Sequence, residues 1–214
     1  MGMATIIIVV SILFFYVMQM SPSPLLLEIR DYYSILNNDM LLNMSASIIF
    51  PFIVLACLVG ATLEEKIGTR NLFTVAAVLV VLGGLTNLIA SSYTILLVGR
   101  AIFGLGFGFG IPFIGSAIMK YYDPVAREKM NTLNGMFPFL GTVICFLFAV
   151  PISRTLGGFK ASLAIWVVPI AICIVMWVVF IKEESLPNYA QEEGEGEVVA
   201  EKGLYLNLWK RKEI

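Results

Sequence analysis

The chain has 214 residues, of which 59% are hydrophobic and only 14% charged, and its formal net charge is −1. This composition excludes an ordinary water-soluble domain, and the chain offers no basic surface for nucleic acid. The sequence therefore describes a protein whose main solvent is lipid.

Six apolar stretches are each long enough to cross a bilayer as a helix, which takes about 20 residues. They are uniformly apolar, whereas the strands of a transmembrane barrel would alternate apolar and polar residues. We predict an all-α membrane protein, a bundle of six transmembrane helices near residues 4–26, 42–61, 72–91, 94–118, 132–153 and 161–181.

The first stretch is predicted to be a retained helix and not a cleaved signal peptide. No basic residue precedes its apolar run, and Ser-Pro-Ser-Pro follows where a small-residue cleavage site would belong. Pro22 and Pro24 remove backbone donors, so the far end of this helix is predicted to kink or unwind.

A polar run, Ala-Thr-Leu-Glu-Glu-Lys-Ile-Gly-Thr-Arg over residues 61–70, separates the second and third stretches. Gly68 allows a short reversal there, because glycine adopts positive φ freely. Acidic and basic groups in such a reversal can hold two helix ends together in one conformation and release them in another. The alternative is a solvated turn whose charges only obey the topology.

The fourth stretch carries an arginine followed by alternate glycines. Arg100 lies about six residues inside the apolar region, where a charge is costly unless it faces protein or water, so it marks a functional site. The alternative is that its long stem snorkels to the outer interface. Spacing by four residues also predicts close helix packing through two pairs of glycines, Gly104 with Gly108 and Gly106 with Gly110.

Lys and Arg residues in the loops predict the orientation. One side would carry ten of these residues and the other only Arg30, Arg154 and Lys160. The positive-inside rule then places both termini in the cytoplasm, as expected for a multi-pass protein of the plasma membrane.

The last part of the chain changes character. Residues 192–197 are acidic and glycine-containing, which predicts a solvated linker, and residues 204–214 form an amphipathic, basic stretch. We therefore divide the chain into a six-helix bundle over residues 1–184 and a cytoplasmic linker over residues 185–214, whose end resembles the approach to a seventh helix.

Catalysis, a metal site and a cofactor are not expected. The chain has no His, its three Cys lie in apolar segments without CxxC spacing, and its apolar segments hold no paired carboxylates. The sequence therefore predicts that the protein is not an enzyme.

The polar run resembles the signature, roughly G-x-L-a-D-R-x-G-R-R, found between the second and third helices of the major facilitator superfamily. The sequence departs from it with Ala61 for the first glycine, Glu65 for the usual aspartate, and Thr69 where a basic residue is common. The arginine-glycine helix resembles the family's fourth helix. The residues that match the loop signature are Leu63, Glu65, Lys66, Gly68 and Arg70.

The resemblance implies the amino-terminal half of a twelve-helix secondary transporter. Such a half would move a small solute by alternating access together with a second six-helix half or another copy of itself. Glu65 would help to stabilise the outward-facing state. The first, fourth and fifth helices would offer pathway residues, namely Arg100, Tyr16, Gln19 and Asn134.

Two further points concern the solute and its coupling. Arg100 favours an anionic or carboxylate-bearing solute, because guanidinium pairs well with that geometry. Proton coupling needs a carboxylate in the pathway, which this half lacks unless Glu28 or Asp31 reaches it. Otherwise coupling depends on the second half, or the protein is a facilitator.

A different class of function also fits six helices. A non-transporting assembly or receptor subunit of the membrane would need the same spans. That alternative gives no reason for the charged loop and the arginine-glycine helix to occur in this order.

Overall fold

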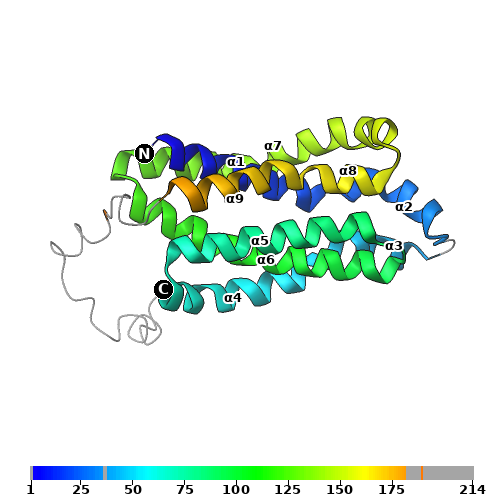
Figure 1. Ribbon diagram of the computed structural model, residues 1–214, viewed down its shortest axis with the longest axis horizontal. Coiled ribbons are helices and arrows are strands. Elements are labelled where there is room, and N and C mark those ends of the chain that lie inside the picture. The colour runs from blue at the N-terminus through cyan, green and yellow to red at the C-terminus, as the bar shows by residue number, and fades with distance from the viewer. Residues whose placement is uncertain (1, 36–37, 182–188, 190–214) are drawn as a thin grey trace, which may run out of the picture.

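The computed structural model describes residues 2–35, 38–181 and 189, and within them every regular element is helical. The elements run along the long axis of one bundle, with α1, α7, α8 and α9 on one side and α4, α5 and α6 on the other (Figure 1). They are α1 (Gly2–Met20), η1 (Ser23–Leu25), α2 (Leu26–Tyr32), α3 (Asp39–Ser47), α4 (Ile49–Ile67), α5 (Thr69–Ile89), α6 (Tyr93–Tyr121), α7 (Pro124–Leu156), α8 (Phe159–Ile165) and α9 (Val167–Phe180).

The prediction of a six-helix membrane bundle is confirmed. Among the described residues, six helical spans are long and apolar enough to cross a membrane. Spans one, two and six are each built from more than one helix, and spans three, four and five from one. The spans are Met3–Tyr32, Asp39–Ile67, Thr69–Ile89, Tyr93–Tyr121, Pro124–Leu156 and Phe159–Phe180.

Several spans extend beyond their apolar stretches, which corrects two expectations about loops. Span five begins at Pro124 and not near residue 132, because the Asp123 side chain accepts a hydrogen bond from the Ala126 amide at 2.8 Å and proline suits the first helical position. Arg127 and Lys129, two of the ten basic residues that the sequence analysis counted in loops on one side, therefore lie in the first turns of α7.

The polar run between spans two and three is also almost entirely helical. Helix α4 continues to Ile67 and α5 begins at Thr69, so Gly68 alone makes the turn, with φ of +82°. Prediction from hydropathy missed these helical turns because hydropathy detects the lipid-facing length, whereas backbone hydrogen bonding continues into water. Residues 185–214, predicted as a linker, lie outside the described residues apart from residue 189.

Prolines divide three of the spans. Pro22 and Pro24 separate α1 from α2 through η1, in the region where the sequence predicted a kink. Pro51 lies in the first turn of α4, just after α3 ends, and Pro169 lies in the first turn of α9, just after α8 ends. Each proline lacks the amide that would bond to the carbonyl four residues earlier, so each division leaves carbonyls that need other donors.

Helix α6 occupies the centre of the contacts, and its glycines face different neighbours. A Cβ on Gly104 or Gly108 would lie 2.7 Å or 2.5 Å from backbone oxygens of α4. A Cβ on Gly106 would lie 2.7 Å from backbone atoms of α5, whereas Gly110 faces the ring of Phe15 on α1. The first pair of glycines thus packs against one helix, and the second pair is divided between two.

Spans two and five are the least covered by the rest of the bundle. Only 22% of the most apolar window is buried in each, compared with 39% or more in the other four spans. Their exposed side chains are large and apolar, including Leu58 on α4 and Phe139 on α7. These two spans therefore offer the surfaces on which lipid or a further bundle can pack.

Candidate functional site

The most elaborate polar constellation lies at the turn between α4 and α5, beside the end of α6. Its centre is Glu64, whose side chain is only 9% exposed although it lies near the end of a span. The Gly68 amide donates to the Glu64 carbonyl at 2.8 Å, which closes α4 and turns the chain into α5. We call Glu64, Thr69, Ser116 and Lys120 the Glu64 cluster.

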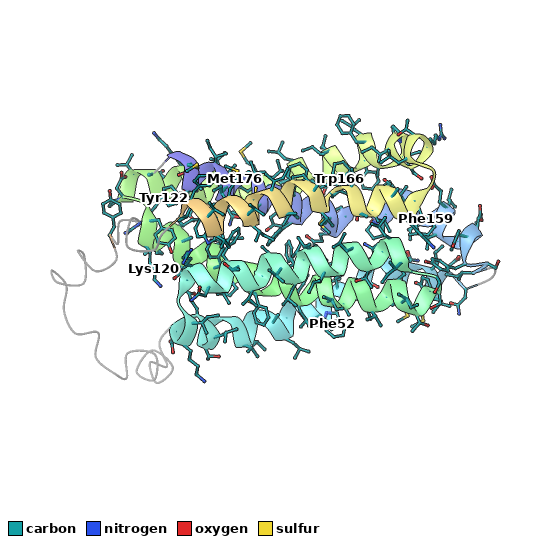
Figure 2. All side chains as sticks on the ribbon, in the orientation of Figure 1. Phe52, Lys120, Tyr122, Phe159, Trp166 and Met176 are labelled. Atoms are coloured by element: carbon teal, nitrogen blue, oxygen red, sulfur yellow. The ribbon has the colours of Figure 1, made fainter. Side chains whose placement is uncertain are left out.

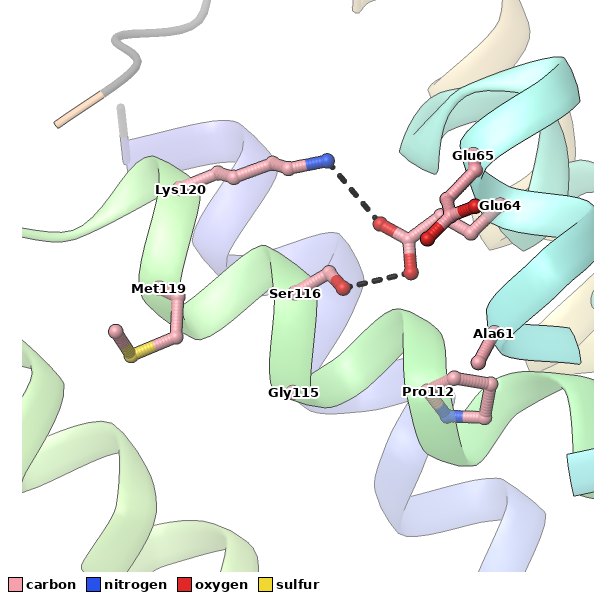
Figure 3. A pocket seen from close by; sticks show the side chains of 8 residues that line it. All are labelled: Ala61, Glu64, Glu65, Pro112, Gly115, Ser116, Met119 and Lys120. Carbon is pink, nitrogen blue, oxygen red and sulfur yellow. Dashed lines mark hydrogen bonds and ion pairs between the residues drawn. The ribbon is translucent and has the colours of Figure 1, made fainter. Parts of the chain in front are cut away.

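Both carboxylate oxygens of Glu64 are hydrogen-bonded, and Figure 3 shows Ser116 and Lys120 reaching them from α6. Thr69 Oγ1 donates to Oε1 at 2.7 Å, and Ser116 Oγ donates to Oε2 at 2.6 Å. Lys120 Nζ lies 3.2 Å from Oε1 and 2.6 Å from Thr69 Oγ1. The cluster therefore joins the ends of three helices through one buried, paired carboxylate.

A hollow of about 550 Å³ opens beside the Glu64 cluster between α4 and α6. Figure 3 shows the side chains around it, which come from both helices. Glu65 contributes a carboxylate to its rim but forms no salt bridge with any described residue. The residues that line the hollow are Ala61, Glu64, Glu65, Pro112, Gly115, Ser116, Met119 and Lys120.

The loop residues chosen from the sequence occupy different positions around this cluster. Leu63 is partly buried against the core, whereas Glu65 and Lys66 are exposed. Arg70 Nη2 donates to the Val178 carbonyl at 3.2 Å, which ties the start of α5 to the last turn of α9. The structure thus places the loop around the cluster, with Gly68 as its turn.

Glu64 itself was missed by the sequence reasoning, which aligned the neighbouring Glu65 with the family's acidic position. The missed signal was helical periodicity, because the buried positions of α4 recur every three or four residues and end at Glu64. Ile53, Ala56 and Gly60 precede it on the same face. Continuing that face through the polar run would have selected Glu64.

Arg100 is the second buried polar centre, and it lies toward the opposite end of the bundle. Its side chain is 1% exposed, so it does not snorkel to the interface. Its guanidinium donates to three backbone carbonyls: Nε to Ser45 at 3.2 Å, Nη1 to Met18 at 2.9 Å and Nη2 to Gln19 at 2.8 Å. The guanidinium carbon also lies 5.0 Å from the centre of the Phe103 ring.

The acceptors of Arg100 explain its burial. Met18 and Gln19 are in the last turn of α1, and Pro22 cannot donate the amide that would bond to the Met18 carbonyl. Ser45 lies in the last turn of α3. Arg100 therefore acts as a carboxy-terminal cap for two helices that end within spans one and two.

The other predicted pathway residues are not gathered at one point. Tyr16 packs edge-on against Phe107, with ring centres 5.2 Å apart, and lies against Gly141 of α7. Asn134 lies on α7 two helical turns before Gly141, about 10 Å away along the axis, and its buried Oδ1 has no hydrogen-bond partner among the described residues.

Gln19 is the predicted residue that lies beside Arg100. It lines a hollow of about 210 Å³ between the end of α1 and the α3–α4 junction, together with Ser23, Asn43 and Ser47. The structure thus brings Arg100 and Gln19 together, and it places Tyr16 and Asn134 along the α1–α7 contact.

Comparison with protein families matches residues 7–213 to the Major Facilitator Superfamily. This match covers nearly all of the chain, and the chain belongs to that family. It is accordingly a multi-pass membrane protein.

Individual relatives agree with this assignment. The H(+)/hexose cotransporter 1 of Parachlorella kessleri is 27% identical over 160 residues, which are 73% of this chain and 29% of that protein. This chain therefore spans less than a third of the length of that curated relative.

Two solved structures share the fold. The proton:xylose symporter XylE bound to 6-bromo-6-deoxy-D-glucose superposes with a TM-score of 0.74 at 14% identity, over 85% of this chain and 45% of that one. The inward-open xylose transporter XylE from E. coli gives 0.71 at 16% identity, over 91% of this chain and 51% of that one. This chain therefore spans about half of each of these structures.

Proposed function

We propose that this six-helix bundle serves as one half of a transporter, which moves a small, neutral, hydroxyl-rich solute by alternating access. The observation that carries the proposal is the low burial of spans two and five, 22% each. A transporter of two bundles needs apolar contact surfaces along which one bundle can rock against the other. A second six-helix half, or another copy of this chain, would supply the opposing surface.

The proposed solute is neutral because of how Arg100 is engaged. Its side chain is buried, and three of its five N–H groups are already directed at carbonyls of α1 and α3. This arrangement weakens the expectation of an anionic solute. The relatives named for hexose and xylose support a sugar or similar polyol instead.

The Glu64 cluster is proposed as the conformational gate. It links α4, α5 and α6 at one end of the bundle, and its hollow opens beside span two, one of the two exposed spans. Glu65 on the rim is available to a donor on the second half, whereas Glu64 holds the three helix ends in place. In this proposal Leu63, Lys66, Gly68 and Arg70 shape and brace the loop.

We also propose that the end carrying the Glu64 cluster is cytoplasmic. Lys66, Arg70, Lys120, Arg127 and Lys129 lie near that end, and α1 begins and α9 ends there (Figure 1). Fewer basic residues lie near the opposite end. This distribution supports cytoplasmic termini by the positive-inside rule, and we propose the plasma membrane as the location.

We propose that the residues of this half contribute little or nothing to proton coupling. Asp31 is exposed and pairs with Arg30. Glu28 is half-buried on α2 and accepts a hydrogen bond from Ser153 of α7, at the end away from the Glu64 cluster. Glu28 is thus the carboxylate to test for proton coupling, and a facilitator remains the simpler reading.

The test is uptake in a host that lacks its own sugar transporters, with the chain expressed together with the DNA that follows it in its locus. We expect saturable uptake of labelled glucose or xylose, no uptake of labelled gluconate, and no uptake in the empty host. Glu64→Gln should reduce transport and Glu65→Gln should change it less.

Two results would contradict the proposal. Uptake of gluconate but not of sugars would show that the solute is anionic, as first expected from Arg100. Identical uptake with and without the expressed locus would favour the alternative function, a non-transporting assembly or receptor subunit.

A further inference from the structure

The hollow beside Gln19 is polar, and its lining differs from that of the Glu64 hollow. It measures about 210 Å³ and lies between the end of α1, η1 and the α3–α4 junction. None of the described residues that line it carries a charge, whereas two carboxylates and an amine border the Glu64 hollow. We call it the Gln19 hollow, and the residues used below are Gln19, Ser23, Asn43, Ser47 and Phe50.

The Gln19 hollow lies where spans one and two are divided. Helix α1 ends at Met20, and α3 ends at Ser47, just before α4 begins. Arg100 holds both helix ends, since its guanidinium donates to the carbonyls of Gln19 and Ser45. The backbone that borders the hollow is therefore fixed before a solute arrives, which lowers the cost of binding one.

The polar side chains of the hollow have unused hydrogen-bonding capacity. The Gln19 amide and the Ser23 hydroxyl form no hydrogen bond with any described residue. Asn43 Nδ2 donates to the Asp39 carbonyl at 2.8 Å, and Ser47 Oγ donates to the Asn43 carbonyl at 3.0 Å. Asn43 Oδ1 and the lone pairs of Ser47 Oγ are left as acceptors. The hollow thus offers donors and acceptors together, as a solute with several hydroxyl groups requires.

The charge and size of the hollow select among polar solutes. An ion that leaves water needs an opposite charge, and no charged side chain lines the hollow among the described residues, whereas a hydroxyl needs only ordinary hydrogen bonds. Phe50, which is 50% exposed, adds an aromatic wall on which the C–H face of a sugar ring can lie. The volume is below the roughly 300–1,000 Å³ of sites for drug-sized ligands, which favours a single ring.

The position of the hollow places it at the outer end of the proposed transporter. In Figure 2, Lys120 and Phe159 lie near opposite ends of the bundle, and in Figure 1 α2 and α3 lie at the Phe159 end. The Glu64 cluster, which contains Lys120, is at the end proposed to be cytoplasmic. Tyr16 lies one helical turn before Gln19 on α1, so a solute that moves inward along α1 from the hollow reaches Tyr16 next.

We propose that the Gln19 hollow is an outer entry subsite, which binds one monosaccharide ring through Gln19, Asn43 and Ser47 before the solute reaches the centre of the bundle. This inference rests on the proposed function, because it names a binding site for the same solute.

The experiment measures glucose binding to the full chain in mild detergent by saturation-transfer difference NMR. Gln19→Ala and Asn43→Ala should each raise the dissociation constant about fivefold, the loss expected for one hydrogen bond. The matched control is Asn71→Ala, which should bind as wild type does. Asn71 is exposed on α5 outside the hollow, and its Nδ2 donates to the Ile67 carbonyl four residues earlier at 2.8 Å, just as Asn43 donates to Asp39.

Both hollow variants are expected to fold, which circular dichroism checks. Arg100 donates to the backbone carbonyl of Gln19, which alanine retains, and alanine suits the helical position of Asn43. Equal dissociation constants in wild type and the folded variants would overturn the proposal. No saturable glucose binding by the folded wild type, an equal loss in Asn71→Ala, or binding of gluconate as tight as that of glucose would also overturn it.

Uptake measurements separate this inference from the proposed function. With the complete locus expressed, Gln19→Ala should raise the half-saturating glucose concentration about fivefold and change the maximal rate by less than about twofold. Sugar uptake with an unchanged half-saturation in Gln19→Ala and Asn43→Ala would overturn the entry subsite and leave the proposed transporter standing. Glucose binding that both variants weaken, without any uptake, would support the subsite and contradict the proposed function.

Discussion

Arg100 supplies the hydrogen bond that Pro22 cannot donate. Nη1 of Arg100 lies 2.9 Å from the Met18 carbonyl, to which an amide at position 22 would donate and to which Ser21 Oγ also donates at 2.8 Å. The arginine on the fourth span and the proline that ends α1 are therefore two parts of one arrangement. The sequence suggested that Arg100 binds solute, whereas in the structure its guanidinium donates hydrogen bonds to backbone carbonyls.

Replacing Arg100 tests this relationship. Arg100→Gln would remove the side-chain donors of the Gln19 and Ser45 carbonyls and leave the Met18 carbonyl with Ser21 alone, so we expect a loss of about 3–5 kcal/mol of stability. Arg100→Lys should lose less, since it keeps three donors but cannot fork across three carbonyls. Thermal unfolding in detergent measures both, with the exposed Arg30→Gln as the control. Unfolding of Arg100→Gln at the wild-type temperature would show that the cap is dispensable.

The Glu64 cluster predicts unequal roles for two adjacent glutamates. Glu64→Ala removes the acceptor for Thr69, Ser116 and Lys120, and we expect about 1–3 kcal/mol of destabilisation. Glu65→Ala should stay within about 0.5 kcal/mol, because this side chain is exposed. Chemical denaturation of the two variants compares them directly. A larger loss of stability in Glu65→Ala than in Glu64→Ala would show that Glu65, the residue chosen from the sequence, is the one that holds the helix ends.

Glycine packing on α6 can be tested within one helix. A Cβ at Gly108 would lie 2.5 Å from the Ile53 carbonyl oxygen, so Gly108→Ala must push α4 away and should cost about 1–3 kcal/mol. Gly115→Ala is the control, because nothing lies within 4 Å of its Cβ position. Alanine there should be neutral or stabilise the helix by about 0.5–1 kcal/mol. Equal unfolding temperatures for the two variants would contradict close packing at Gly108.

Tyr33 predicts a dependence on alkaline pH. Burial, and then the neighbouring Tyr32, raise the pKa of Tyr33 to about 12, and its hydroxyl donates to the Ala90 carbonyl at 2.8 Å. Since tyrosine ionises near pH 10 in an unfolded chain, this stabilisation is complete below about pH 10 and is lost as the pH rises through 12.

The comparison of wild type with Tyr33→Phe isolates this group from the other tyrosines. Wild type should unfold at a higher temperature at pH 8, by an amount equivalent to about 1 kcal/mol. The difference should shrink between pH 10 and pH 12. A difference that is constant over this range would show that Tyr33 does not titrate as proposed.

The sequence predicted the spans well because lipid imposes a length and an apolar composition that can be counted. It predicted poorly where helices continue into water, as at Pro124, because capping and backbone bonding are local and independent of hydropathy. It also selected Arg100 as a pathway residue, which stays a prediction, and did not identify the acceptors of its guanidinium. Those acceptors are carbonyls exposed by breaks in other helices, which no spacing within α6 can reveal.

The choice between Glu64 and Glu65 illustrates a second limit. A motif compares letters at fixed positions, whereas burial depends on the angle at which a helix presents each position. Helix α4 turns Glu64 inward and Glu65 outward, so adjacent carboxylates have different surroundings. The family signature selects Glu65 and the helical period selects the buried Glu64, and a gating role for this turn stays a prediction.

The cap on α1 also constrains the order in which the protein can mature in the membrane. Arg100 follows Met18 by 82 residues, and at about 5–20 residues per second a ribosome needs roughly 4–16 s to synthesise that length. During this interval the end of the first span has only local donors, such as Ser21 Oγ, which donates to the Met18 carbonyl at 2.8 Å. Docking of the fourth span then adds the hydrogen bonds from Arg100 to the Met18 and Gln19 carbonyls, so the cap on α1 is complete only after the middle of the chain has been synthesised.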